Sequence, residues 1–193
     1  MESQLKIGIA GECFKYGFEK GFKQDIKTIE SIEEIKDFDL IVFSGGEDVT
    51  PELYGEVNTN SYNNPKRDAF EYNILQECLK LDKKIFGVCR GHQLINAVLG
   101  GKLNQNLIPS HRGSHLIKVI KDNPIVDYYK DKLVTSMHHQ AVLQPGKDFE
   151  VLALHPELFT IEATKCNDNI ITVQFHPEVQ SYPEFFNLVK EWC

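Results

Sequence analysis

A seven-residue segment, residues 87–93, constrains the fold of this chain more than any other feature. It follows a short apolar run at residues 84–86 and leads into a helical pattern over residues 94–99. A strand, a glycine-flanked cysteine and a helix form the pattern of a nucleophile elbow, with Cys89 as its central residue. The turn strains that residue, and a side chain at either glycine would collide with the neighbouring strand or helix. The pattern predicts a Cys89 thiol at a helix N-terminus, where the helix dipole favours thiolate. The alternative is a buried structural cysteine.

The remainder of the first half alternates strand and helix patterns. Continuous or alternating apolar runs predict strands over residues 5–10 and 39–43. One or two short helices are expected within residues 14–35, and a longer helix over residues 65–81 begins at Pro65. Between them, residues 47–66 are rich in Gly, Pro, Asn and Tyr, which predicts a long surface loop. This alternation implies a parallel sheet.

The second half is richer in short strands. They are expected at residues 116–120, 133–135, 150–154, 161–164 and 170–175, with a terminal helix over residues 182–192. No repeat or linker interrupts the chain, and 193 residues suit one domain of ordinary size. We therefore predict a single α/β domain over residues 1–193, with a parallel core and extra antiparallel strands in the second half.

Composition excludes several classes of partner. The net charge is −7 and no Lys/Arg cluster stands out, which argues against a nucleic-acid surface. The N-terminus lacks the pattern of a signal peptide, and no apolar run approaches about 20 residues, the length of a membrane span. We expect a cytoplasmic protein with neither nucleic acid nor membrane as a partner. The five cysteines show no paired spacing and are expected to be free thiols, with Cys78 packed on the apolar face of a helix.

A catalytic cysteine needs a base and a group that orients the base. His176 follows the predicted strand over residues 170–175, and strand ends are where open parallel sheets place active-site groups. Pro177 fixes the backbone after it, so that Glu178 can turn back to bond the far imidazole nitrogen. The chain therefore predicts a triad of Cys89, His176 and Glu178.

The other histidines offer weaker candidates. His92 is expected to support the elbow turn, and the adjacent His138 and His139 could bind metal, but no carboxylate is spaced to complete a zinc site. Ordinary solvated or structural roles are expected for three more, although His111 with Arg112 could line a pocket edge; these are His111, His115 and His155. We predict no metal and no cofactor.

Acyl transfer also requires backbone amides that stabilise an oxyanion. The elbow supplies the amide of Arg90, the residue after the nucleophile. Gly46, at the end of the strand over residues 39–43, could bring a second amide close because it has no side chain. The alternative for Gly46 is an ordinary turn between a strand and a loop.

These segments resemble the class I glutamine amidotransferase superfamily, whose elbow is G-x-C-x-G-x-Q and whose triad ends in H-P-E. Both motifs are complete here, at residues 87–93 and 176–178. Further segments resemble the peptidase C26 branch, the γ-glutamyl hydrolases, which include the γ-glutamyl-γ-aminobutyrate hydrolase type. They lie at residues 44–56, 67–71, 94–101 with Gln105, and 137–141.

The resemblance implies a flavodoxin-like open sheet with helices on both faces. It implies Cys89 as nucleophile, His176 as general acid/base, Glu178 as its orienting group, and an oxyanion hole from the Gly46 and Arg90 amides. It also aligns Gln93, His138 and Gln140 with positions that hold the α-amino and α-carboxylate ends of a glutamyl group. The chain is shorter than the usual hydrolases of this branch, which puts part of the leaving-group pocket in doubt.

We therefore predict a γ-glutamyl hydrolase that acts through a thioester on a small-molecule substrate. Two leaving groups are considered: γ-aminobutyrate, or a nucleotide phosphoramidate as in the capsule biosynthesis of some bacteria. The alternative is a glutaminase subunit that delivers ammonia to a synthetase partner. Such subunits usually carry S-P-G-P or G-G-P after the second strand, whereas this chain has Glu47-Asp48 after Gly45-Gly46. A third alternative is a catalytically silent binding module; an intact triad argues against it. A homo-oligomer is left open.

Overall fold

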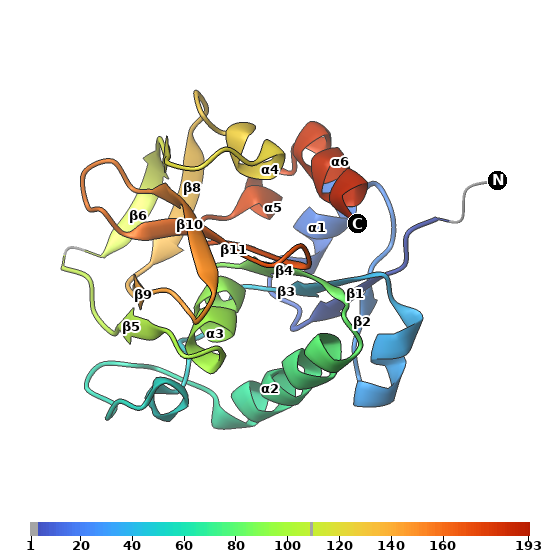
Figure 1. Cartoon of the computed structure of the whole chain (residues 1–193), viewed down its shortest axis with the longest axis horizontal. Coiled ribbons are helices and arrows are strands. Elements are labelled where there is room, and N and C mark those ends of the chain that lie inside the picture. Colours follow the sequence, from blue (N-terminus) through green and yellow to red (C-terminus); the bar gives the residue numbers. More distant parts are fainter. Residues whose placement is uncertain (1–3, 109) are drawn as a thin grey trace.

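The computed structural model describes residues 4–108 and 110–193 (Figure 1). Its main element is an eight-stranded sheet in the order β2-β1-β3-β4-β12-β11-β10-β7. The first five strands are parallel: β2 (Lys27–Thr28), β1 (Ile7–Ala10), β3 (Leu40–Phe43), β4 (Lys84–Val88) and β12 (Ile170–Val173). The other three are antiparallel: β11 (Ile161–Cys166), β10 (Phe149–Leu154) and β7 (Lys118–Val119). The predicted parallel core with added antiparallel strands is confirmed.

The central strands form because their residues are apolar on both sides. Every residue of β1, β3 and β12 is buried, and alternate residues pack into two separate cores. Leu40 and Val42 face one core, while Ile41 and Phe43 face the other. A strand buried on both faces requires helices on both faces of the sheet.

Helices cover the two faces as expected for a flavodoxin-like sheet (Figure 1). On one face lie α1 (Lys15–Phe22), α4 (Pro124–Asp127), α5 (Pro177–Gln180) and α6 (Pro183–Trp192); on the other lie α2 (Pro65–Lys80) and α3 (Arg90–Val98). The rings of Phe22 and Phe186 join α1 to α6 at 4.7 Å between centroids. Each such buried ring contributes on the order of 2–3 kcal/mol through area removed from water.

Local signals set the ends of α2 and α3. Asn64 caps α2 by accepting a hydrogen bond from the amide of Arg67, 3.3 Å away, and Pro65 occupies the first helical position. After α3, Gly100 takes a φ of +91°, a conformation that glycine adopts without penalty. The predicted helix over residues 65–81 and the predicted stop at Gly100 are confirmed.

Two short ribbons lie outside the main sheet. One pairs β5 (Lys102–Asn104) with β9 (Ala141–Gln144), and the other pairs β6 (His111–His115) with β8 (Val134–His138). The sequence predicted only part of β8 among these four strands. Residues 111–115 read His-Arg-Gly-Ser-His and carry none of the apolar residues that signal a strand.

The prediction for residues 47–66 is wrong in one respect. The segment is a connection with a short 3₁₀ turn, η2 (Pro51–Tyr54), but it does not lie wholly on the surface. Val49, Pro51 and Tyr54 are buried and anchor its first half against the core. Four further elements were not separately predicted: the edge strand β2, the 3₁₀ turn η1 (Ile32–Asp37) and the short helices α4 and α5. Within the described ranges, every helix is too short or too polar to cross a membrane.

Candidate active site

Cys89 lies on a strained turn between β4 and α3, as the elbow pattern predicts. Its φ of 52° and ψ of −103° are unfavourable for any residue with a side chain. Its amide donates to the carbonyl of Val173 on β12, 2.8 Å away. A Cβ on Gly87 would lie 2.9 Å from the side chain of Thr172, and one on Gly91 would lie 2.2 Å from the carbonyl oxygen of Phe43. Both glycines are therefore needed for close approach to neighbouring strands.

His176 and Glu178 meet beside this thiol. The Nδ1 atom of His176 lies 2.6 Å from Oε1 of Glu178, and both side chains are buried. Burial alone lowers the pKa of His176. The hydrogen bond and charge of Cys89, together with those of Glu178, outweigh that effect and raise the pKa of His176 to about 10. The imidazole of His176 therefore lies beside the Cys89 turn and bonds Glu178, and the catalytic roles of the three residues stay a prediction.

The glycine pair after β3 lies against the same two residues. A Cβ on Gly45 would be 3.1 Å from Cε1 of His176 and 3.8 Å from Cβ of Cys89. Gly46 has a φ of +146°, and a Cβ there would lie 2.0 Å from a guanidinium nitrogen of Arg67. The two amides predicted to form the oxyanion hole therefore belong to the Gly45–Gly46 peptide, which lies beside Cys89, and to Arg90, the first residue of α3.

A buried ion network fixes this peptide, and no spacing rule in the sequence reveals it. Arg67 donates to the Gly45 carbonyl at 2.8 Å and to Glu71 at 2.7 Å. The guanidinium of Arg90 is buried and pairs with Asp68 and Glu71. The arginine side chain at position 90 therefore points into the protein, joining α3 to α2, and only its backbone amide is available near the thiol.

The three residues predicted to hold a glutamyl head group converge on one carbonyl. Gln93 Nε2 donates to the Gln140 carbonyl at 2.9 Å, and His138 Nδ1 lies 2.8 Å from the same oxygen. The side-chain nitrogen of Gln140, Nε2, donates to the Ser61 hydroxyl at 2.6 Å. All three side chains are buried. Two of their polar atoms, His138 Nε2 and Gln140 Oε1, have no hydrogen-bond partner among the described residues.

Cys13 lies next to the candidate site, although no pattern in the sequence marked it. Its sulfur would be 3.7 Å from a Cβ on Gly45, the position that also contacts Cys89 and His176. Burial, followed by the charges of Glu178 and Cys89, raises the pKa of the Cys13 thiol. The thiol therefore stays protonated near neutral pH and belongs to the wall of the site.

The chain carries a second His-Pro-Glu sequence, at residues 155–157, which shows how little the tripeptide alone specifies. His155 Nδ1 accepts hydrogen bonds from the amides of Glu157 and Leu158, each 3.1 Å away. At residues 176–178 the Nδ1 atom of His176 bonds the side chain of Glu178 instead. His176 follows β12, which pairs with β4 and so brings the imidazole to Cys89, whereas His155 follows β10, which pairs with β11 and β7.

The adjacent histidines His138 and His139 point in different directions. His139 turns toward Asp48, with Nε2 at 2.9 Å from the carboxylate, whereas His138 faces His111 and Glu162. Glu162 of β11 therefore places a carboxylate beside His138, although none is near it in the sequence. His92 is buried and its Nδ1 lies 2.7 Å from the hydroxyl of Thr172, consistent with support of the elbow.

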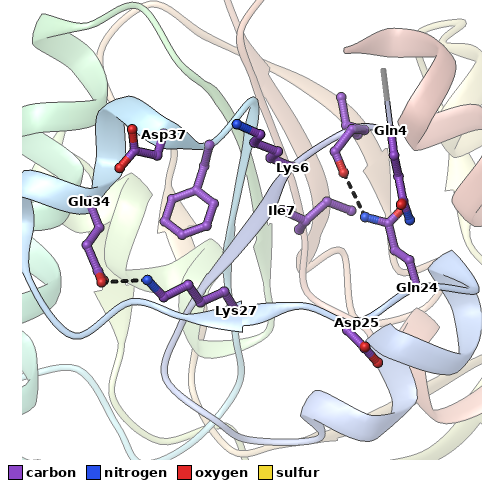
Figure 2. Close-up of a pocket in the computed structure, with 10 residues that line it drawn as sticks. Gln4, Lys6, Ile7, Gln24, Asp25, Lys27, Glu34 and Asp37 are labelled. Carbon is purple, nitrogen blue, oxygen red and sulfur yellow. Dashed lines mark hydrogen bonds and ion pairs between the residues drawn. The ribbon is translucent and has the colours of Figure 1, made fainter. Parts of the chain in front are cut away.

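A cavity of about 540 Å³ lies at the opposite end of the sheet (Figure 2). It is lined by residues at the amino ends of β1 and β2, including Lys6 and Lys27, and Lys27 is paired with Glu34 at 2.7 Å. Cys89 lies at the carboxyl end of β4, so this cavity is remote from the thiol. Ligands in open α/β sheets bind at the carboxyl ends, and we place the candidate site there.

Comparison with known proteins agrees with this geometry. The family model for Peptidase C26 matches residues 22–178. The glutamine amidotransferase-like protein YvdE of Lactococcus lactis is 32% identical over 182 residues, covering 84% of this chain and 77% of that protein. A glutamine-hydrolysing GMP synthase subunit from Saccharolobus solfataricus is 31% identical, covering 87% of this chain and 84% of the relative.

Solved structures show the same fold. A Thermoplasma acidophilum protein assigned as a GMP synthase subunit has a TM-score of 0.78 at 18% identity, covering 100% of this chain and 96% of its own. A Thermotoga maritima glutamine amidotransferase has a TM-score of 0.68 at 16% identity, with 98% and 84% covered. With the family match spanning most of the chain, this protein belongs to the peptidase C26 family of the class I glutamine amidotransferase superfamily.

Proposed function

We propose that this protein is a cysteine-dependent hydrolase that cleaves the γ-glutamyl amide bond of a small-molecule conjugate, releasing glutamate and a free amine. The observation that supports the proposal is that His176 lies beside the strained Cys89 turn and bonds Glu178, with 2.6 Å between Nδ1 and Oε1. Membership of the peptidase C26 family supports the same class of reaction. The reaction needs no metal or cofactor, since thiol, imidazole and backbone amides supply each step.

In the proposed first step the Cys89 thiolate attacks the γ-carbonyl carbon, and the amides of Gly46 and Arg90 stabilise the oxyanion. His176, as imidazolium, donates its proton to the departing nitrogen as the C–N bond breaks. The products of this step are the free amine and a γ-glutamyl thioester on Cys89. Neutral His176 then removes a proton from water, which attacks the thioester, and glutamate leaves as the thiolate is restored. Glu178 keeps the imidazole in the required orientation.

We assign the glutamyl head group to the wall formed by Gln93, His138 and Gln140. A zwitterionic head needs several directional polar groups in a confined space. The shared hydrogen bonds to the Gln140 carbonyl hold this wall rigid. For the leaving group we retain the two options raised by the sequence: γ-aminobutyrate, or a nucleotide phosphoramidate of capsule biosynthesis.

One observation favours a second candidate function, a glutaminase subunit that supplies ammonia to a synthetase partner. Relatives from Saccharolobus solfataricus and Sulfolobus acidocaldarius are glutamine-hydrolysing GMP synthase subunits, at 31% and 32% identity. Against this stand the match to the peptidase C26 model and the Glu47-Asp48 sequence after the glycine pair. Glu47 pairs with Arg67 at 2.7 Å and closes the network around Gly45.

The test measures glutamate release by the purified chain alone from a panel of conjugates: γ-glutamyl-aminobutyrate, polyglutamate, a γ-glutamyl nucleotide amidate and glutamine. We expect at least one conjugate to be cleaved faster than glutamine. Cys89→Ala should lower turnover by about 10⁴-fold or more. Cys166→Ala, a half-buried thiol remote from the site, is the matched control. Cleavage of glutamine alone would establish the glutaminase alternative, and turnover by Cys89→Ala near that of wild type would contradict both.

A further inference from the structure

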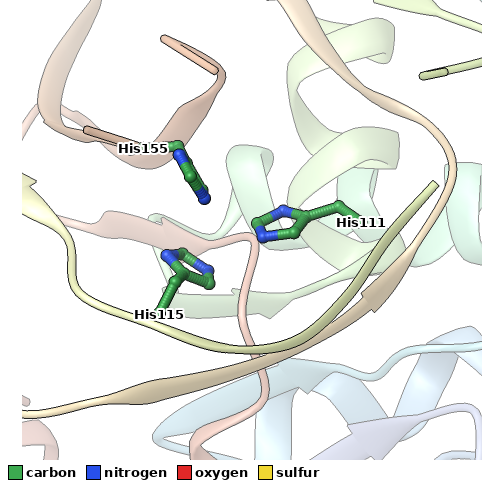
Figure 3. Close-up of side chains that lie close together, drawn as sticks. All are labelled: His111, His115 and His155. Atoms are coloured by element: carbon green, nitrogen blue, oxygen red, sulfur yellow. The ribbon is translucent and has the colours of Figure 1, made fainter. Parts of the chain in front are cut away.

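A group of histidines outside the triad gathers where the β6·β8 ribbon meets the main sheet. We call His111, His115, His138 and His155 the histidine cluster. Figure 3 shows the imidazoles of His111, His115 and His155 facing one another, with ring centroids 4.4–4.6 Å apart. His111 pairs with His138 across the ribbon at 4.9 Å between centroids. His111 and His115 share one face of β6 because side chains alternate along a strand.

A buried carboxylate from the main sheet completes this group. Glu162 of β11 is fully buried, and its Oε2 has no hydrogen-bond partner among the described residues. That oxygen lies 4.0 Å from Nε2 of His115. Candidate ligand atoms of His111, His138 and Glu162 all lie within 4.8 Å of one another. Burial raises the pKa of the Glu162 carboxyl to about 8, so without a cation this group holds a proton, which a bound metal ion would displace.

Two further buried atoms point to the same place. His138 Nε2 and His111 Nδ1 have no hydrogen-bond partner within the described part of the chain. His138 is 6% exposed, so water reaches it poorly. Three unpaired polar atoms in one buried group are rare in folded proteins, because each costs about 1–3 kcal/mol. A single ligand that accepts electron pairs from all of them would satisfy the group.

Hydrogen bonds to the backbone determine which imidazoles can ligate. Nδ1 of His138 lies 2.8 Å from the Gln140 carbonyl, and Nδ1 of His115 lies 2.8 Å from the Leu116 carbonyl. A carbonyl only accepts, so in both neutral rings Nδ1 carries the hydrogen and Nε2 carries a lone pair. Nε2 of His138 has no partner among the described residues, whereas Nε2 of His115 lies 3.0 Å from the Ser136 hydroxyl. Ligating histidines typically donate their other N–H in this way, which fixes the tautomer and the ring orientation.

His155 has the opposite tautomer. Its Nδ1 accepts from the amides of Glu157 and Leu158, so its Nε2 carries the hydrogen and cannot ligate. This distinguishes two overlapping groups: His111 with His115 and His155, and His111 with His138 and Glu162. The second group has available lone pairs and supplies a negative charge.

We propose that His111, His138 and Glu162, with His115 as fourth donor, bind a divalent transition-metal ion, and that this ion is zinc. Imidazole nitrogen and carboxylate oxygen in a four-donor set suit tetrahedral zinc. Zinc–nitrogen bonds of about 2.0–2.1 Å place donors roughly 3.4 Å apart, so His111, His138 and Glu162, whose ligand atoms lie within 4.8 Å of one another, move closer on binding. His115 joins them by giving up its contact with the Ser136 hydroxyl. The ion lies outside the Cys89–His176–Glu178 triad and takes no part in the hydrolysis proposed above.

The role of this ion is to join the β6·β8 ribbon to the main sheet. An isolated two-stranded ribbon is marginally stable, and this ribbon forms its own sheet. His138 comes from β8 and Glu162 from β11, so the metal links the two sheets directly. The ribbon also supports the base, since the amide of His176 donates to the Thr135 carbonyl at 2.8 Å. With Nδ1 on the Gln140 carbonyl and Nε2 on the metal, His138 shapes the head-group wall through its ring alone, and Gln93 and Gln140 make the polar contacts.

The test uses full-length protein carrying Cys13→Ser and Cys89→Ser, which removes the thiols that would compete near His176. After dialysis against a chelator, zinc is titrated and metal content is measured by mass spectrometry; cobalt absorption reports a tetrahedral donor set. We expect one zinc per chain and a rise in Tm on zinc addition. Glu162→Gln and His138→Gln should each weaken zinc binding more than about 100-fold. Removing a residue that only bonds a metal ligand typically costs about 10–100-fold.

Two control variants keep the donor set falsifiable. His139→Gln lies next to His138 in sequence but bonds Asp48, and should bind zinc within a few-fold of the parent. His155→Gln should do the same. If zinc fails to bind the parent, or binds Glu162→Gln and His138→Gln unchanged, the proposal is wrong. Loss of binding in His155→Gln with retention in Glu162→Gln would also overturn it, in favour of the three-imidazole group. Because the readouts are metal content and Tm, neither outcome depends on the hydrolase proposal.

Discussion

At the scale of single residues, the backbone of Cys89 trades stability for the position of the thiol. Its φ of 52° with ψ of −103° is a conformation that costs about 1–3 kcal/mol for a residue with a side chain. Cys89→Gly and Cys89→Ala both remove the thiol, but only glycine relieves the backbone. We expect Cys89→Gly to be more stable than Cys89→Ala by about 1 kcal/mol, after the entropy that glycine loses on folding. Urea denaturation checks this; equal or reversed stabilities would show that the turn is unstrained.

His176 gives the site a dependence on pH. Its pKa is raised to about 10, so turnover should hold through neutral pH and fall as the pH approaches 10, where the imidazolium loses the proton it donates to the amine. The folded state also holds this proton more tightly than the unfolded state. Its contribution to stability is complete below about pH 6.5 and is lost as the pH rises through about 10. Turnover rates measured against pH check the first expectation. The difference in unfolding free energy between wild type and His176→Gln, measured against pH, checks the second.

Gly46 is the residue at which a single methyl group should be most informative. A Cβ there would lie 2.0 Å from Arg67, and the φ of +146° disfavours any side chain. Gly46→Ala should shift the proposed oxyanion donor and lower kcat by about 10²–10³-fold, the usual effect of losing one donor. Gly113→Ala is a matched control because it also has positive φ but has open space around it. Similar losses in both variants would argue against the donor role.

At the scale of elements, the ion network between α2 and α3 holds the elbow helix in place. Arg90→Met leaves Asp68 and Glu71 buried with fewer cations, and should cost about 3–5 kcal/mol of unfolding free energy. Lys80→Met breaks an exposed pair on the same helix, Lys80 with Glu77 at 3.2 Å, and should cost less than about 1 kcal/mol. Urea midpoints compare the two. Equal losses would mean that the network contributes little.

The sequence predicted those elements whose burial is visible in their own residues. The apolar runs of β3, β4 and β12 and the capped helix α2 are confirmed because one local signal sufficed for each. The strand β6 is polar and forms only by pairing with β8, so no local signal existed. The presence or absence of a local signal also decides which parts of the candidate site could be predicted. The order of thiol, imidazole and carboxylate follows from motifs, whereas Cys13 reaches it only through tertiary packing.

At the scale of the whole molecule, we propose that residues 1–193 form one domain. The two hydrophobic cores share the strands of a single sheet, so neither can unfold without exposing the other. Calorimetry should show one transition whose measured enthalpy equals the van't Hoff enthalpy. Two resolved transitions, or an enthalpy ratio well above one, would divide the chain into separate units. The measurement should be made with metal removed and with zinc added, because a bound ion stabilises the folded state.

The position of β12 has a consequence for synthesis of the chain on the ribosome. This strand is translated after the other seven strands of the main sheet, yet it lies at the middle of that sheet, between β4 and β11. Until it emerges, the parallel and antiparallel halves have no shared edge, and Cys89 lacks both its hydrogen-bond partner Val173 and the neighbouring side chain of His176. The nascent protein therefore carries two open strand edges until β12 emerges, and His176 can reach Cys89 only after that point.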